Sequence, residues 1–175
     1  MRNQLRNGIL FVCLEMLLGI GIVHQVIAQP LTQNLTQSSK KSEITLFQNL
    51  TVLPKFSPDP QILRGISGGI EEMQNQSGKE NTETGKCIGF IDTAPDHQIT
   101  LSSAFDFLQL KVSSTGDTVL LIKGPGGVWC NDDDSDRNPE ISGAWLPGIY
   151  QVWIGSYDAN ASFPYLLEIS QQRPK

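Results

Sequence analysis

Residues 148–157 read GIYQVWIGSY, and this stretch decides the fold that the sequence predicts. Side chains that suit a core alternate with others along it, a period of two that is typical of a β-strand with one buried face. A Pro-Gly turn precedes the stretch, and glycine there supplies the positive φ that such a turn needs. We therefore expect a strand over residues 149–157. Its core face would consist of Tyr150, Val152 and Ile154, opposite Gln151 and Trp153.

Six further short apolar runs follow residue 87, separated by turn residues at intervals of about ten. Such spacing is typical of a sandwich or barrel and not of βαβ units. The sequence therefore predicts an all-β fold, a small antiparallel β-sandwich or jelly roll. The six expected strands cover residues 87–91, 98–101, 105–113, 118–123, 128–130 and 165–170. Alternation adds two core triplets, Leu108, Leu110 and Val112 in one strand and Tyr165, Leu167 and Ile169 in another.

The first 28 residues are expected to be a secretory signal peptide. They begin with Arg2 and Arg6, continue with a mostly apolar run, and end in Val26-Ile27-Ala28, which fits a small-residue cleavage site. An uncleaved membrane anchor is the alternative, because residues 8–28 are almost long enough to span a bilayer, which needs about 20 residues. The sequence thus predicts a secreted or periplasmic protein, with no membrane insertion once the signal is removed.

The remaining chain is expected to have three parts. Residues 29–56 are rich in Gln, Asn, Ser, Thr and Lys without a sustained period, which indicates a flexible, disordered leader. Residues 57–86 contain Pro-rich, Gly-rich and polar stretches and are expected to be an exposed connector. The β-sandwich domain would then occupy residues 87–171.

Charge excludes two classes of partner. Without residues 1–28 the chain has 11 basic and 17 acidic residues and a net charge of −6. Nucleic acids and anionic membrane surfaces both require clustered Lys and Arg. The partners that remain are a cell-surface polymer or an exported protein.

Two cysteines, Cys87 and Cys130, remain after the signal segment. An even pair in an exported protein is most simply a disulfide, and two buried free thiols are the alternative. The cysteines are 43 positions apart. On the loop-entropy model, closing a loop of this length stabilises the fold by about 4 kcal/mol.

Residues 124–139 read GPGGVWCNDDDSDRNP and concentrate four aspartates in one loop. Alternating aspartates can bring three carboxylates to one side of a loop, as calcium with its 6 to 8 oxygen ligands requires. An EF-hand is excluded, because Arg137 and Gly143 occupy the places of its Gly and its bidentate Glu. A solvated acidic turn, neutralised in part by Arg137 and water, is the alternative. The candidate calcium ligands are Asn131, Asp132, Asp134, Asp136 and Asn138.

Three aromatic residues are candidates for ligand binding, because exposed aromatic faces beside acidic and amide groups suit sugars or peptide backbones. They are Trp129, Trp153 and Tyr157. Trp153 lies opposite the core face of its strand, so we expect it to be partly exposed. In the alternative, every tryptophan packs within the second sheet, since aromatic side chains dominate small β cores.

An ordered series of short motifs runs through residues 57–170. The motifs include Asp117-Thr118-Val119-Leu120, Gly124-Pro125, Trp129-Cys130-Asn131-Asp132-Asp133, Asn138-Pro139 and residues 147–157, preceded by Ser57-Pro58-Asp59-Pro60, Arg64-Gly65, Ser67-Gly68-Gly69 and Cys87-Ile88-Gly89-Phe90. In this order they resemble the bacterial pre-peptidase C-terminal domain family, in a subgroup seen in cyanobacteria. The resemblance implies a small secreted sandwich or jelly roll, a structural or binding role, and calcium binding in some relatives. The usual pattern includes a peptidase domain, and we expect none in this sequence.

Catalytic patterns are not evident. After the signal segment the chain has one histidine, His97, and no zinc spacing, Cys-His nucleophile pattern or cofactor fingerprint. Adjacent loop aspartates do not provide the cleft that glycoside hydrolysis needs. We expect a secreted, non-catalytic binding or structural module that acts at the cell surface or in the periplasm. The alternative is an accessory or inhibitory factor for a separately encoded exported peptidase.

Overall fold

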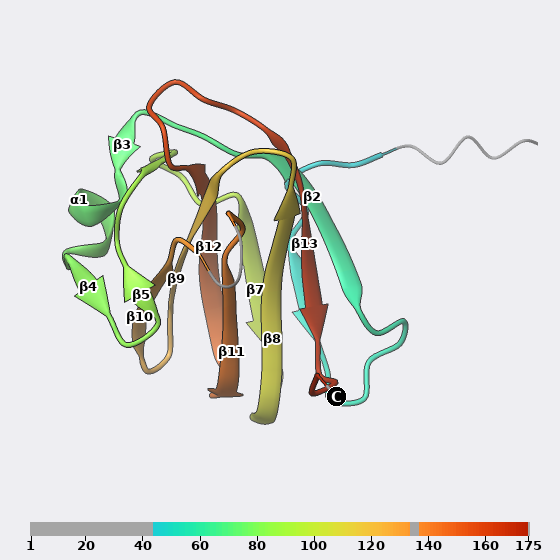
Figure 1. Cartoon of the computed structure of the whole chain (residues 1–175). Coiled ribbons are helices and arrows are strands. Elements are labelled where there is room, and N and C mark those ends of the chain that lie inside the picture. The colour runs from blue at the N-terminus through green and yellow to red at the C-terminus, as the bar shows by residue number, and fades with distance from the viewer. Residues whose placement is uncertain (1–43, 134–136, 175) are drawn as a thin grey trace, which may run out of the picture. The chain divides into compact units, whose positions relative to one another are not determined.

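The computed structural model describes residues 44–133 and 137–174, and it confirms the all-β fold (Figure 1). Two sheets form a sandwich, and one short helix, α1 (Met73–Ser77), lies beside it. The expected signal peptide, residues 1–28, lies outside the described residues and stays a prediction. In the described ranges no helix has the length and apolar character needed to cross a membrane.

The larger sheet is built around its longest strand, β12. This strand pairs with β7 and β6 along one side and with β9 along the other, and β10 continues the sheet beyond β9. All of these pairs are antiparallel, while β1 joins β7 in parallel. The seven strands are β1 (Leu50–Val52), β3 (Glu71–Glu72), β6 (Phe90–Ile91), β7 (His97–Leu101), β9 (Thr118–Gly124), β10 (Gly127–Asn131) and β12 (Gly148–Ser156).

The smaller sheet has the strand order β11-β8-β13-β2 and is antiparallel throughout. Its strands are β2 (Gln61–Ile66), β8 (Phe105–Ser114), β11 (Glu140–Trp145) and β13 (Pro164–Ser170). A separate short hairpin, β4 (Asn81–Thr82) with β5 (Gly85–Lys86), lies next to β10.

The main core lies between the two sheets. All three predicted core triplets belong to it, and no member is more than 3% exposed. The triplets come from β8, β12 and β13, whose period of two places every second side chain on the inner face. The alternation in the sequence therefore predicted the core directly.

A second apolar cluster covers the outer face of the larger sheet. Its members are Met73, Cys87, Ile91, Val119, Leu121, Cys130 and Trp153. Trp153 is only 1% exposed, so the expectation that it would be partly exposed is wrong. The physical reason is that Met73, in the connector that was expected to be exposed over residues 57–86, and Cys87, which follows this connector, both lie over this face.

The sandwich also begins earlier than residue 87. Strands β1 and β2 precede Cys87 and pair with β7 and β13. The stretch around Gly65 was expected to be a Gly-rich loop, but it is the interior of β2. Glycine fits there because a Cβ at position 65 would lie 2.2 Å from the hydroxyl oxygen of Tyr165, and glycine inside a strand often marks such a close approach.

Strand boundaries after Cys87 follow the prediction to within one residue, with two larger differences. Only residues 90 and 91 of the expected strand 87–91 form β6, and β11 was not expected at all. The sequence of β11, EISGAW, has three small residues in its middle, which weakens a strand signal based on β-branched and aromatic residues.

Candidate functional site

Three carboxylates lie together at one end of the β9–β10 hairpin. One oxygen from each of Asp117, Asp132 and Asp133 lies within 4.8 Å of the others. Asp117 immediately precedes β9, and Asp132 immediately follows β10. Because the two strands are antiparallel neighbours, with Leu120 opposite Asn131, the start of one and the end of the other meet.

The electrostatics of this aspartate cluster show negative charge without full compensation. Burial, and then the carboxylates of Asp133 and Asp117, raise the pKa of Asp132 to about 6, while Lys86 opposes the rise. Burial and Asp133 also raise the pKa of Asp117, and Arg137 opposes it. A nearby cation would relieve both effects, since an opposite charge favours the ionised form.

Two oxygen atoms of the cluster have no hydrogen-bond partner within residues 44–133 and 137–174. Oδ1 of Asp117 and Oδ1 of Asp132 are buried and accept no hydrogen bond from the described residues. Buried polar atoms are normally satisfied, and unsatisfied ones are costly. The three aspartates could therefore hold a metal ion.

The structure places only some of the predicted calcium ligands in the aspartate cluster. Asp132 belongs to the aspartate cluster, whereas Asp134 and Asp136 lie outside the described residues. The amides of Asn131 and Asn138 are engaged elsewhere. Oδ1 of Asn131 accepts a hydrogen bond from the N–H of Glu140, and its Nδ2 donates to the carbonyl of Thr84. That Asn131 and Asn138 bind calcium stays a prediction.

Asn138 holds a neighbouring turn in place. Its Oδ1 accepts from the hydroxyl of Thr118 over 3.0 Å, and its Nδ2 donates to the carbonyl of Ser114 over 3.2 Å. These bonds connect the end of the acidic loop to the turn that carries Asp117. Asn138 thus helps to position the aspartate cluster.

Sequence reasoning missed Asp117, although a usable signal was present. The Pro125-Gly126 turn places Gly124 opposite Gly127, and this pairing fixes the register of the hairpin. Counting outward from that pair brings residue 119 opposite residue 132, which leaves Asp117 next to the acidic loop.

The predicted disulfide between Cys87 and Cys130 is present, with Cα atoms 5.1 Å apart. Cys130 is the penultimate residue of β10, two positions before Asp132. Because Cys87 belongs to the segment over the outer face of the larger sheet, the crosslink ties this segment to the strand that carries the acidic loop. Such a crosslink is consistent with export.

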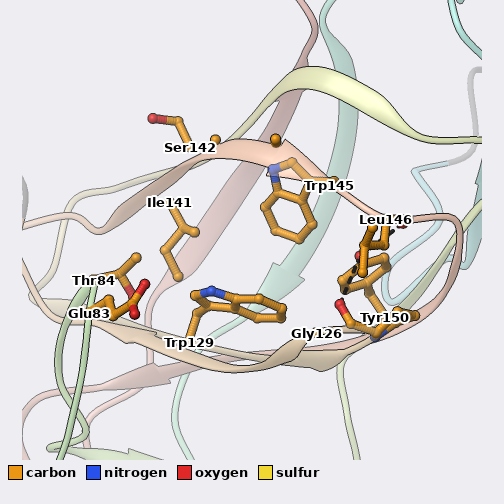
Figure 2. Close-up of a pocket in the computed structure, with 12 residues that line it drawn as sticks. Glu83, Thr84, Gly126, Trp129, Ile141, Ser142, Trp145, Leu146 and Tyr150 are labelled. Carbon is orange, nitrogen blue, oxygen red and sulfur yellow. Dashed lines mark hydrogen bonds between the residues drawn. The ribbon is translucent and has the colours of Figure 1, made fainter.

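A second feature lies between the edge strands β10 and β11, where an aromatic pocket of about 360 Å³ opens (Figure 2). Trp129 forms one wall and Trp145 another, with ring centroids 5.8 Å apart, and Tyr150 packs edge-on against Trp145 at 5.0 Å. Glu83 and Thr84 lie at one end and Leu146 at the other.

The three candidate binding aromatics are therefore separated in space. Trp129 lines the aromatic pocket, Trp153 is buried under residues 71–87, and Tyr157 is 45% exposed away from the pocket lining. Tyr150 was expected only in the core, but it also reaches the pocket, where its hydroxyl donates to the carbonyl of Leu146 over 2.9 Å.

Comparison with known proteins identifies a relative. Over 107 residues the chain is 32% identical to an uncharacterized protein of Synechococcus elongatus, a match that spans 58% of this chain and 79% of that protein. The chain belongs to the family of this Synechococcus protein. No family model matches the chain.

Two solved structures are similar in outline to this member of the Synechococcus protein family. One is the pre-peptidase C-terminal domain of a Bacillus anthracis collagenase, with a TM-score of 0.42, 12% identity, and coverage of 70% of this chain and 94% of that one. The other is a periplasmic inhibitor of g-type lysozyme, PliG from Aeromonas hydrophila, with a TM-score of 0.40, 16% identity, and coverage of 70% and 97%. At such scores the similarities assign no function, and membership in the pre-peptidase C-terminal family stays a prediction.

Proposed function

We propose that this protein is an exported, non-catalytic β-sandwich module that binds calcium at Asp117, Asp132 and Asp133. The observation that supports this function best is a pair of buried Oδ1 atoms, in a cluster of three carboxylates, that have no hydrogen-bond partner in the part of the chain that the structure describes. Carboxylates gathered without a full complement of hydrogen bonds carry a desolvation cost, which a bound cation offsets.

Calcium suits this donor set better than the other common metals. The cluster offers oxygen atoms only, which hard cations prefer, while zinc favours the nitrogen and sulfur of His and Cys. Calcium also tolerates irregular geometry and 6 to 8 ligands, whereas magnesium demands a near-ideal octahedron. Three carboxylates supplemented by backbone carbonyls and water match the calcium requirement.

A non-catalytic role is supported by the state of the histidine. His97 is only 1% exposed. Its Nδ1 bonds to the carbonyl of Gln48 and its Nε2 to the hydroxyl of Tyr165, both over 2.8 Å. Burial lowers the pKa of His97, so the neutral ring is a structural link between β7 and β13. Export is supported by the disulfide and by the predicted signal peptide.

Calcium titration by calorimetry of chelator-treated, full-length protein tests the proposal. We expect heat of binding and a higher melting temperature, because a ligand at 100 times its Kd stabilises the folded state by about 2.7 kcal/mol. The variant Asp132→Asn should lose both responses. Asp106→Asn is the matched control, since Asp106 is an exposed residue of β8 outside the aspartate cluster. Absence of heat and of any shift in melting temperature, or equal responses from both variants, would refute the calcium site.

A further inference from the structure

Most edges of the two sheets are protected from pairing with another chain. Natural proteins protect edges with charge, short strands or a covering segment, because an edge strand presents unpaired N–H and C=O groups. At β2 the carbonyl of Arg64 accepts a hydrogen bond from the N–H of Phe47 over 2.9 Å. In the larger sheet, the edge strand β3 is short and consists of two charged residues, Glu71 and Glu72.

The edge of β10 is covered at Cys130 by the β4–β5 hairpin. The N–H of Cys130 donates to the hydroxyl of Thr82 over 3.0 Å, and its carbonyl accepts from the hydroxyl of Thr84 over 2.8 Å. Threonine side chains thus replace a neighbouring strand at this point. We call the gap between the edge strands β10 and β11 the seam. The seam is therefore closed at the end where Cys130 lies.

The edge of β11 is different, because among the strands of the described residues β11 pairs only with β8. The N–H of Val112 donates to the carbonyl of Pro139, which makes residues 112 and 139 a hydrogen-bonded pair. Hydrogen-bonded and non-hydrogen-bonded pairs alternate in antiparallel sheets. Ser142, opposite Gln109, therefore directs its N–H and C=O away from β8.

These outward groups of Ser142 are open to another chain. No hydrogen bond within the described residues engages the backbone of Ser142, whereas the outward N–H of Glu140 is satisfied by Asn131. The strand then continues with Gly143 and Ala144, and a Cβ at position 143 would meet no atom within 4 Å. Small, uncharged residues on an edge allow a second backbone to approach closely.

The aromatic pocket lies directly beside this open edge, and its walls are fixed. Nε1 of Trp145 donates to the carbonyl of Leu108 over 2.8 Å, and Tyr150 is held by its bond to Leu146. Figure 2 shows Trp129 and Trp145 as adjacent walls of the pocket, and Ile141 of β11 lies beside them on the side of Glu83. A volume of about 360 Å³ has room for a large apolar side chain.

Glu83 gives the pocket one negatively charged end. Its side chain is exposed and forms no salt bridge within residues 44–133 and 137–174. The whole chain is also acidic, with a net charge of −5. A basic residue next to the apolar side chain of an occupant would complement this charge.

We propose that β11 is a docking edge for an extended peptide segment of a partner protein. The segment adds as a strand at Ser142, places a large apolar side chain in the pocket of Trp129, Trp145 and Tyr150, and presents a basic residue to Glu83. Strand addition of this kind draws affinity from main-chain hydrogen bonds and specificity from side-chain pockets. The docking edge does not depend on calcium, so the two proposals can fail separately.

Fluorescence anisotropy with labelled hexapeptides tests the docking edge on the full-length protein. The probes are Thr-Lys-Val-X-Val-Thr, with X as Phe, Trp, Leu, Gly or Asp, together with a form of the Phe peptide that is N-methylated at alternate residues. We expect the Phe, Trp and Leu peptides to bind, the Gly and Asp peptides to bind at least about tenfold more weakly, and N-methylation on the bonding edge to abolish binding.

Two variants separate the strand contact from the pocket contact. Ser142→Pro removes the outward N–H without removing a bond to β8, and proline is tolerated at such edge positions. Trp129→Ala removes one wall of the pocket. Each variant should bind the Phe peptide at least about tenfold more weakly than the wild type does. Ser142→Ala, which keeps the N–H, and Tyr157→Ala, outside the pocket, are the matched controls, and melting temperatures establish that all four variants fold.

Three results would overturn the proposal. Binding of no peptide at millimolar concentration, or equal binding by wild type and Ser142→Pro, would remove the docking edge. Binding of cellotetraose or chitotetraose that is lost in Trp129→Ala but unchanged in Ser142→Pro would assign the pocket to carbohydrate. Concentration-dependent dimers in light scattering that disappear in Ser142→Pro would assign the edge to a second copy of this chain.

Discussion

The side-chain oxygen of Asn131 accepts a hydrogen bond from the backbone N–H of Glu140 over 3.1 Å, and this bond joins the edge strands β10 and β11. The same amide donates to the carbonyl of Thr84 over 2.7 Å, so it also holds the β4–β5 hairpin. Asn131 therefore closes one end of the seam that opens at the aromatic pocket.

Replacing Asn131 with alanine should lower the free energy of unfolding by about 1–3 kcal/mol, because a backbone N–H and a backbone carbonyl both lose their partner. Urea denaturation measures the change. Gln172→Ala serves as the control, since Gln172 is exposed near the end of the chain and no interaction of its side chain is present in the described residues. An equal loss of unfolding free energy in the two variants would show that the hydrogen bonds of Asn131 do not stabilise the fold.

Reduction of the Cys87–Cys130 disulfide should cost about 4 kcal/mol, since the crosslink closes a loop of 43 residues in the unfolded chain. Urea denaturation with and without reductant measures this cost. Calcium affinity should fall in the same experiment, because β10 and the adjacent Asp132 lose their anchor. An unchanged calcium affinity in the reduced, folded protein would separate the disulfide from the cation site.

Stability should fall as pH rises through the titration of Asp96. This carboxyl is only 8% exposed and accepts a hydrogen bond from the N–H of Ile154 over 2.7 Å. Burial raises its pKa from 3.8 to about 7, with a further rise from Asp92. Between these two values the folded state binds more protons than the unfolded state, so stability declines from acid to neutral pH.

Asp96→Asn keeps the oxygen that accepts from Ile154 and should raise stability at pH 8 by about 2 kcal/mol. Melting temperatures of chelated protein at pH 5 and pH 8 give the comparison. Asp132 also lowers stability as pH rises, up to its pKa of about 6. His97 opposes both, because its lowered pKa makes the folded state less stable below pH 6.5. If the melting temperature of Asp96→Asn changed with pH as that of the wild type does, Asp96 would not be the source of the pH dependence of stability.

Iodide should quench one tryptophan and leave the others largely protected. Trp153 is 1% and Trp145 is 7% exposed, while Trp129 is half-buried in the aromatic pocket. Trp129→Phe should therefore remove most of the quenchable fluorescence, and Trp153→Phe should remove little. Strong quenching that persists in Trp129→Phe would place another indole at the surface.

The sequence determined the core strands and the crosslink. Alternation along Tyr150, Val152 and Ile154 requires only that neighbouring side chains of a strand point to opposite faces, which is a local property of the backbone. Cys87 and Cys130 were expected to pair because they are the two cysteines that follow the expected signal segment, and the structure confirms their disulfide. Both conclusions needed no knowledge of distant contacts.

The tertiary structure decided where the remaining residues lie. Trp153 is buried because residues 71–87 cover the outer face of the larger sheet. Gly65 lies in a strand because it pairs with Tyr165 of β13, whose ring occupies the space that a side chain at position 65 would need. Local periodicity identifies which residues form strands, but the covering of a sheet face depends on contacts between residues far apart in the chain.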